Sequence, residues 1–260
     1  MADAPVNVIC MKWGTMYGPE YVNRLHAGVR RHLQRPHRFV CFSDTAEGLD
    51  PGIEAMPLPS LGLPPGHNDL RWQKLAVFGR ELADLRGQTL FLDLDLVVVD
   101  ALDPFFELPG RFRIIRDADL FRPKLRRKLN PERDRFLRMI GNSSVFRYTI
   151  GEQAYILDAF AADPDAATRA YPMSQQFQSA QLAAHDELEY WPRGWCVSFK
   201  NDCVPRFPRN YVADPVLPPG ARIVVFAGRL KMADVLEGRG NRPHRRIGNV
   251  DWLRRAWAEA

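Results

Sequence analysis

Thr89-Leu-Phe-Leu-Asp-Leu-Asp-Leu-Val-Val-Val-Asp100 is the stretch of sequence that decides the fold. It is an apolar run long enough for a buried strand, interrupted by Asp93 and Asp95. Because side chains alternate across a strand, both acids are expected on one face. Burying an ionised carboxylate costs on the order of several kcal/mol unless a cation or hydrogen-bond donors compensate it. The stretch therefore predicts a metal site at the carboxyl end of a buried strand.

An alternative is a strand that ends at Leu92, followed by two acids that only cap a loop. A second apolar run at residues 96–99 follows at once and favours the continuous strand. An aspartyl-phosphate phosphatase would also place Asp-x-Asp after an apolar strand. That motif usually lies near the N-terminus and continues into Gly-Thr or Gly-Val, whereas Leu96 and Val97 follow here. The phosphatase is therefore the weaker interpretation.

The chemistry of the two acids indicates the ligand. Carboxylates without nearby His or Cys favour a hard cation, Mg²⁺ or Mn²⁺, and such ions commonly join protein carboxylates to substrate phosphates. The expected partner is a diphosphate leaving group, whose developing charge the metal would offset as a Lewis acid. Lys74 and Lys231 are candidates to share that role.

Composition sets broad limits. The chain has 260 residues, of which 46% are hydrophobic and 26% charged, as expected for one large globular domain with a substantial core. The formal net charge of +5 suggests an anionic partner. The four cysteines form no CxxC pair, and from the N-terminal residues and the lengths of the apolar runs we expect neither a signal peptide nor a membrane-spanning segment. We therefore expect a cytoplasmic protein.

Hydrophobic periodicity gives the order of elements. Residues 6–11 form an expected strand, followed by a Gly-containing loop, a helix ending before Pro36 and a second strand at residues 38–42. This order is the opening of an α/β nucleotide-binding unit. A helix over residues 70–85 is expected to lead into the acidic strand. Further expected elements are strands at 53–58, 111–116, 141–146, 196–200 and 222–226, a helical turn at 102–108, and helices at 151–162, 174–184 and 250–258.

Residues 122–138 are the most cationic part of the chain. They are either a solvated insert or a surface that meets anionic lipid or a charged acceptor. The second interpretation would make the protein membrane-peripheral. Nucleic-acid binding would rest on charge alone, since no recognised module accompanies the basic segments.

Residues 90–100 resemble the Asp-x-Asp strand of nucleotide-sugar-dependent glycosyltransferases with a GT-A fold, and most closely that of the bacterial galactosyltransferase and glycogenin group. Ordered similarities continue at residues 72–78, 142–146, 191–200 and 224–231. The resemblance implies an α/β, Rossmann-like single domain over residues 1–260. Residues 1–100 would be its nucleotide-binding half, and residues 101–260 its acceptor-side half with a basic tail.

The resemblance also implies roles for individual residues. Asp93 and Asp95 would bind the metal, and Asp93, Asp95 and Gln175 would be the catalytic residues. The loop from Met11 to Tyr17 would hold the nucleotide base, with Tyr17 either stacking on it or serving as a core aromatic. The implied donor-binding residues are Met11, Tyr17, Lys74, Asp93, Asn142, Ser143, Gly228 and Lys231.

Two positions depart from the family pattern. Ala227, next to Phe226, stands where the family usually has a histidine as third metal ligand, and Ser174 precedes Gln175 where an acid is usual. A two-carboxylate site completed by diphosphate and water can still hold Mg²⁺ or Mn²⁺. The family retains anomeric configuration, so no enzyme nucleophile is required if the leaving phosphate helps to deprotonate the acceptor. An inverting enzyme would need a base, for which Asp117 and Asp119 are the candidates.

The function expected from the sequence is metal-dependent transfer of a hexose from a nucleotide diphosphate sugar, with UDP as nucleotide. The acceptor would be a hydroxyl of a saccharide or glycolipid. The alternative from another class is a catalytically degenerate protein of the same fold that binds a nucleotide sugar or glycan. A nucleotidyltransferase that makes the activated sugar is a third possibility, but no Gly-rich activating loop lies near the N-terminus.

Overall fold

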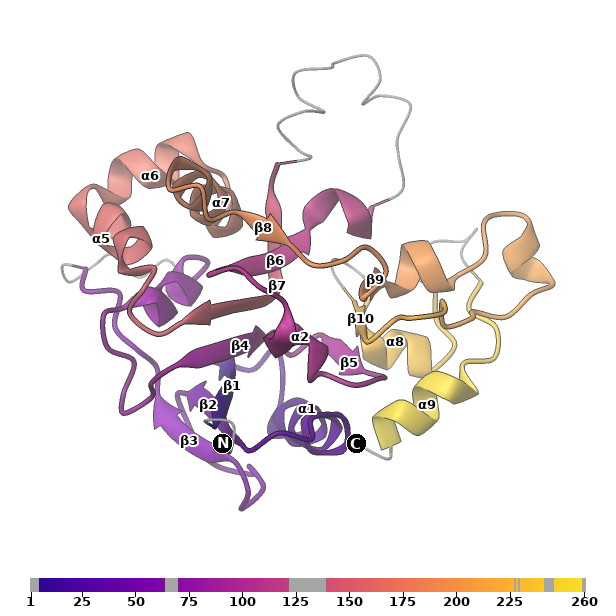
Figure 1. Ribbon diagram of the computed structural model, residues 1–260. Helices are drawn as coiled ribbons and strands as arrows, with labels where there is room; N and C mark the ends of the chain where they lie inside the picture. The colour runs from indigo at the N-terminus through magenta and orange to yellow at the C-terminus, as the bar shows by residue number, and fades with distance from the viewer. Residues whose placement is uncertain are drawn as a thin grey trace, which may run out of the picture.

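Two sheets organise the part of the chain that the computed structural model describes, which comprises residues 5–63, 70–121, 139–226, 228, 230–240 and 246–258. The larger sheet has seven strands in the order β3-β2-β1-β4-β7-β6-β8 (Figure 1). Its strands are β1 (Val6–Lys12), β2 (His37–Ser43), β3 (Glu54–Pro57), β4 (Gln88–Leu92), β6 (Arg113–Arg116), β7 (Gly141–Thr149) and β8 (Glu189–Tyr190).

Strand β1 is buried along its whole length and lies between β2 and β4, in parallel with both. The chain leaves β1 through α1 (Pro19–His32) and passes to β2 and then β3 on one side, while β4 lies on the other side. Strand order therefore reverses between β1 and β4. In open α/β sheets, ligands bind beyond the carboxyl ends of the strands at such a switch point.

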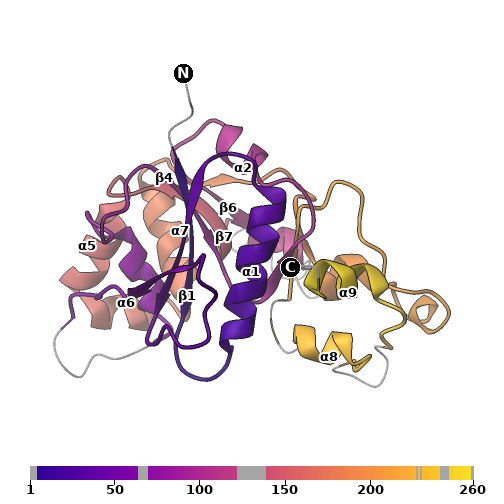
Figure 2. The same cartoon turned by 90° about the horizontal axis from the view of Figure 1, so that it is seen from below.

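Helices cover both faces of the larger sheet (Figure 2). On one face, α1 and α2 (Pro104–Glu107) pack over the core cluster that contains Val8, Cys41 and Leu92. On the other, the cluster around Phe91 and Phe146 is covered by a short 3₁₀ helix, η1 (Gln73–Phe78), and by α5 (Ala154–Ala162), α6 (Pro164–Ala170) and α7 (Ser174–Ala184). The alternating side chains of the central strands thus supply two separate cores.

The smaller sheet has the order β5-β10-β9 and comprises β5 (Leu96–Val98), β9 (Cys196–Ser198) and β10 (Ile223–Val225). Its own core includes residues of α8 (Met232–Leu236) and α9 (Asp251–Ala258). Figure 2 shows these two helices beyond α1, on the opposite side from α5 and α6. A 3₁₀ turn η2 (Asp117–Leu120), a π-helical turn η3 (Phe199–Cys203) and a 3₁₀ turn η4 (Arg209–Tyr211) complete the described elements.

Two expectations about local structure are wrong. Residues 70–85 do not form one helix, because η1 ends at Phe78, where Gly79 follows in an extended conformation, and Ala83 has a positive φ of 49°. The strand expected over residues 89–100 is divided into β4 and β5. Strand β4 pairs with β1 and β7, whereas β5 pairs with β10 in the smaller sheet, so the chain changes sheets at residues 93–95.

The predicted α/β class and GT-A-like organisation are confirmed, and the other predicted strands and helices are found with small shifts at their ends. Helices α6 and α8 were not predicted. The cationic segment 122–138 and Ala227 lie outside the described residues, as do positions 241–245 of the basic tail. No described helix is long and apolar enough to cross a membrane.

Candidate functional site

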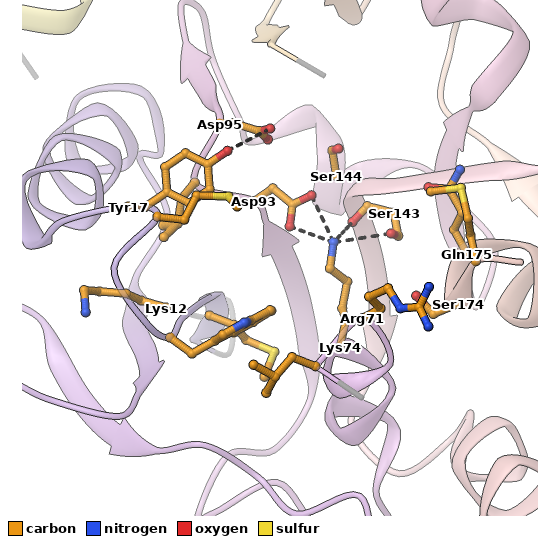
Figure 3. Close-up of a pocket in the computed structure, with 16 residues that line it drawn as sticks. Lys12, Tyr17, Arg71, Lys74, Asp93, Asp95, Ser143, Ser144, Ser174 and Gln175 are labelled. Atoms are coloured by element: carbon orange, nitrogen blue, oxygen red, sulfur yellow. Dashed lines mark hydrogen bonds and ion pairs between the residues drawn. The ribbon is translucent and has the colours of Figure 1, made fainter. Parts of the chain in front are cut away.

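A cavity of about 440 Å³ opens at the switch point between β1 and β4. A volume of this size falls in the usual range for small-molecule sites. Its floor comes from the end of β1, from residues 93–95 and from the start of β7, and its walls come from the loop after β1, from η1 and from the N-terminus of α7 (Figure 3). The lining residues are Met11, Lys12, Trp13, Met16, Tyr17, Leu70, Arg71, Lys74, Asp93, Leu94, Asp95, Ser143, Ser144, Met173, Ser174 and Gln175.

Strand β4 ends at Leu92, so the segment 93–95 that carries the two acids is not part of a strand. Asp93 and Asp95 line the cavity, while Leu94 also belongs to the buried core cluster beneath α1. Backbone hydrogen bonds fix this arrangement on both sides. The amide of Asp93 donates to the carbonyl of Ser144 at 2.9 Å, and the amide of Phe226 donates to the carbonyl of Asp95 at 2.8 Å. The acids are therefore held by both sheets.

Lys74 is bound directly to Asp93. Its Nζ lies 2.7 Å from Oδ1 and 2.9 Å from Oδ2 of that carboxylate, and it also donates to the carbonyl and hydroxyl of Ser143 at 3.0 and 3.3 Å (Figure 3). The ammonium group also lies 5.0 Å from the centroid of the Phe91 ring. Lys74 of η1 thus forms charge-assisted hydrogen bonds to Asp93 at the floor of the cavity.

Asp95 is compensated less completely. The Tyr17 hydroxyl donates to its Oδ2 at 3.3 Å, and Lys231 Nζ lies 3.9 Å from the same oxygen while donating to the Tyr17 hydroxyl at 2.7 Å. Burial, followed by the negative charge of Asp93, raises the pKa of Asp95 above its usual value; the two lysines oppose this shift. Burial and the neighbouring Asp95 also raise the pKa of Tyr17, whose hydroxyl therefore keeps its proton.

The donor set is suited to a hard divalent cation. The carboxylates of Asp93 and Asp95 share one cavity, and carboxylate oxygens are ligands that Mg²⁺ and Mn²⁺ prefer. Asp93 and Asp95 would hold the ion. Within the described residues no group of three or more His, Cys, Asp or Glu side chains is placed to bind a metal, so the remaining ligands would come from substrate and water.

Seven of the predicted site residues line the cavity together: Met11, Tyr17, Lys74, Asp93, Asp95, Ser143 and Gln175. Lys231 is not a lining residue but reaches Tyr17 and Asp95 at the edge. Asn142 is turned away into a structural role, because its Nδ2 donates to Asp117 and its Oδ1 accepts from the amide of Ser144. Gly228 has a positive φ of 94°, and a Cβ there would lie 3.2 Å from Lys200 Nζ.

Several lining residues carry no motif in the sequence. Lys12 is buried at the end of β1, with its Nζ 3.6 Å from a carboxylate oxygen of Asp44. Lys12 ends an apolar strand, and it was not predicted as a site residue from the sequence. Met16, Leu70 and Met173 come from three different segments and are 76%, 50% and 52% exposed. They give the cavity an apolar rim above its charged floor.

No protein-family model matches this sequence, and no curated protein matches it significantly. Solved structures do resemble it. The bifunctional glycosyltransferase WbbM in its apo form matches with a TM-score of 0.58 and 12% identity, covering 88% of this chain and 47% of its own. This chain therefore spans about half the length of WbbM.

Two further structures have the same fold. The galactosyltransferase LgtC in complex with donor and acceptor sugar analogs matches with a TM-score of 0.55 and 13% identity, covering 86% of this chain and 88% of LgtC. The apo glycosyltransferase GlyE of Streptococcus pneumoniae TIGR4 matches with a TM-score of 0.59 and 11% identity, covering 98% of this chain and 61% of GlyE. At such identities the likeness shows a shared fold, that of GT-A-like glycosyltransferases.

Proposed function

We propose that this protein is a glycosyltransferase that moves a hexose from a nucleotide diphosphate sugar, with UDP as the nucleotide, to a hydroxyl of a saccharide or glycolipid. The observation that carries the proposal is the meeting of Asp93, Asp95 and Lys74 in a cavity at the switch point of a GT-A-like sheet. Fold alone would not assign an activity, because unrelated functions share folds. The proposal therefore depends on the residues of the site.

Different residues of the cavity would bind the base and the diphosphate of the donor. The loop from Met11 to Tyr17 would receive the base, in keeping with its place after β1. Lys74 and Lys231 flank the acids from two sides and would neutralise charge on the diphosphate as the bond to the sugar breaks. Residues 1–100 would thus supply most donor contacts, although Ser143 and Gln175 reach the same cavity from the second half.

Mn²⁺ or Mg²⁺ bound by Asp93 and Asp95 would supply Lewis-acid stabilisation to the leaving diphosphate. Gln175 lies at the first turn of α7 and lines the cavity, so its amide would bind hydroxyls of the sugar. The apolar rim of Met16, Leu70 and Met173 would face the acceptor and bind the less polar face of a saccharide or the start of a lipid aglycone. Asp117 and Asp119 do not line the cavity, so neither side chain supports an inverting mechanism.

The test is donor binding and hydrolysis with a matched control. In a thermal-shift screen of nucleotide sugars with and without Mn²⁺, one donor class should bind the wild type and raise its melting temperature. Asp93→Asn and Asp95→Asn should lower donor hydrolysis by about 100-fold or more. Asp100→Asn, at an exposed carboxylate that pairs with Arg222, should retain activity. Full activity in either site variant would contradict the proposal.

The alternative is a non-catalytic protein that binds a nucleotide sugar or glycan. It is favoured by Ala227 and Ser174 in the sequence and by the two-carboxylate donor set. The same assay separates the two functions. Binding of UDP with Mn²⁺, without release of sugar to water or to any offered saccharide, would support the binding protein.

A further inference from the structure

Aromatic contacts join helix α9 to the acidic site, although residues of α9 are more than 150 positions away from Asp95 in the sequence. The ring of Trp257 meets the ring of Tyr21 edge to face, with centroids 5.3 Å apart and an interplanar angle of 61°. Tyr21 meets Tyr17 in the same way at 5.0 Å and 68°. The Tyr17 hydroxyl then contacts Asp95 and Lys231.

Trp257 is anchored independently at its other side. The Arg24 guanidinium lies 5.0 Å from the centroid of its ring, and Arg24 also donates a hydrogen bond to the Trp257 carbonyl. Arg24 and Tyr21 are three residues apart on α1, so they lie on neighbouring positions of one helical face. Trp257 is therefore clamped between two side chains of α1.

The ring contact with Tyr21 joins Tyr17 to helix α1. Tyr17 lies in the loop between β1 and α1, where Gly14 has a positive φ and no helix or strand restrains the backbone. Its ring packs against the core beneath α1 but remains partly buried. Edge-to-face aromatic pairs contribute on the order of 0.5–1.5 kcal/mol beyond the area that they bury. The contact between Tyr17 and Tyr21 therefore favours the observed position of the Tyr17 ring.

We infer that Trp257 is a positioning residue for the donor site: by packing on Tyr21 it holds Tyr17 where Tyr17 binds Asp95 and Lys231. The inference rests on the proposed function for its ligand, because the groups held are those assigned to the diphosphate. Coupling is reciprocal, so a ligand that orders Tyr17 and Lys231 also stabilises the docking of α9 on α1.

The first test compares two tryptophans of α9. Trp257→Ala should raise the dissociation constant for UDP in the presence of Mn²⁺ by about 5-fold or more. Trp252→Ala is the matched control, because Trp252 is also half-buried on α9 but donates to the carbonyl of Pro215 and packs near Phe199. It should leave UDP affinity within about 2-fold of the wild type. Trp257→Phe, which keeps an aromatic edge against Tyr21, should retain most of the UDP affinity of the wild type.

The second test begins with the nucleotide-free protein. Hydrogen exchange of the α9 amides in the free protein should become faster in Tyr17→Ala and remain unchanged in Met16→Ala, an exposed neighbour in the same loop. In the wild type, UDP with Mn²⁺ should slow this exchange.

The outcomes separate the two proposals. Wild-type protein that binds no nucleotide contradicts the proposed function, and α9 exchange in Tyr17→Ala then decides the inference alone. Equal UDP affinity in folded Trp257→Ala and wild type, or α9 exchange that ignores Tyr17→Ala, overturns the inference while leaving the proposed function intact.

Discussion

Trp72 and Phe160 stack face to face, with ring centroids 4.8 Å apart and planes inclined by 8°. Trp72 is 2% exposed and also meets Phe177 edge to face, so it fastens η1 to both α5 and α7. Lys74 lies two residues further on in η1, so the packing of Trp72 helps to position the Lys74 side chain.

Replacement of Trp72 by alanine should therefore lower the free energy of unfolding by about 3–5 kcal/mol, the usual cost of deleting a buried aromatic side chain. Urea denaturation provides the measurement. Trp72→Phe, which keeps a ring against Phe160, should lose clearly less. A loss below about 1 kcal/mol for Trp72→Ala would show that the cavity collapses and that η1 is held by other contacts.

The ion pair of Lys74 and Asp93 should make a measurable contribution to stability. Their side chains are 16% and 26% exposed, and Lys74→Met leaves the Asp93 carboxylate without its cation. We expect a loss of about 1–3 kcal/mol in the free energy of unfolding. Adding Asp93→Asn to Lys74→Met should recover part of that loss in a double-mutant cycle. Arg80→Met, which breaks an exposed pair with Asp158, should change stability by less than about 1 kcal/mol.

Two glycines with positive φ separate steric clash from backbone strain. Gly151 has φ of 85°, and an added Cβ would lie 2.9 Å from the carbonyl oxygen of Arg80, whereas Gly220 has φ of 77° and open space around its Cα. Gly220→Ala should cost about 1 kcal/mol from strain alone. Gly151→Ala should cost clearly more by thermal or urea unfolding. Equal losses would mean that the segment around Arg80 yields without cost.

Stability should decrease at mildly acidic pH because of His26. Burial, aided by the charge of Arg30, lowers the pKa of His26 below its usual 6.5. The unfolded chain therefore takes up a proton at higher pH than the folded protein. The stability that neutral His26 contributes is therefore fully present above pH 6.5, and it is lost as the pH falls from there through the pKa of His26 in the folded protein.

Unfolding free energies measured between about pH 7.5 and 5.5 should show this loss, with a shallower slope in His26→Leu. A residual slope is expected from His32, whose pKa is lowered by burial and by Arg31. An unchanged slope in His26→Leu would assign the pH dependence to other groups.

The larger sheet was predictable because its strands carry local signals. Strand β1 and the strands next to it are apolar runs in the sequence. Asp93 and Asp95 line one cavity, although the continuous strand from which their common face was predicted is absent at residues 93–95. The sequence does not predict which strands pair with one another. Nothing local distinguishes residues 88–92, which pair with β1 and β7, from residues 96–98, which pair with β10.

The cavity was predicted best where a motif marked it. Asp93, Asp95, Lys74 and Gln175 were identified in advance as site residues and are brought together, whereas Asn142 forms a hydrogen bond to Asp117 that no spacing reveals. Helix periodicity also misled over residues 70–85, where tertiary packing of Trp72 selects a short 3₁₀ helix over the longer helix that the apolar spacing favours.

The chain passes from one sheet to the other at residues 93–95, and both sheets hold this segment. The number of residues between the two acids is therefore fixed. Asp93 is bonded through its amide to β7, and Asp95 through its carbonyl to the residue after β10, with only Leu94 between them. One inserted residue would break one of these two backbone hydrogen bonds or move one carboxylate away from its place in the cavity. This segment should therefore accept substitutions at Leu94 far more readily than any insertion or deletion, whereas exposed loops of the same protein tolerate changes in length.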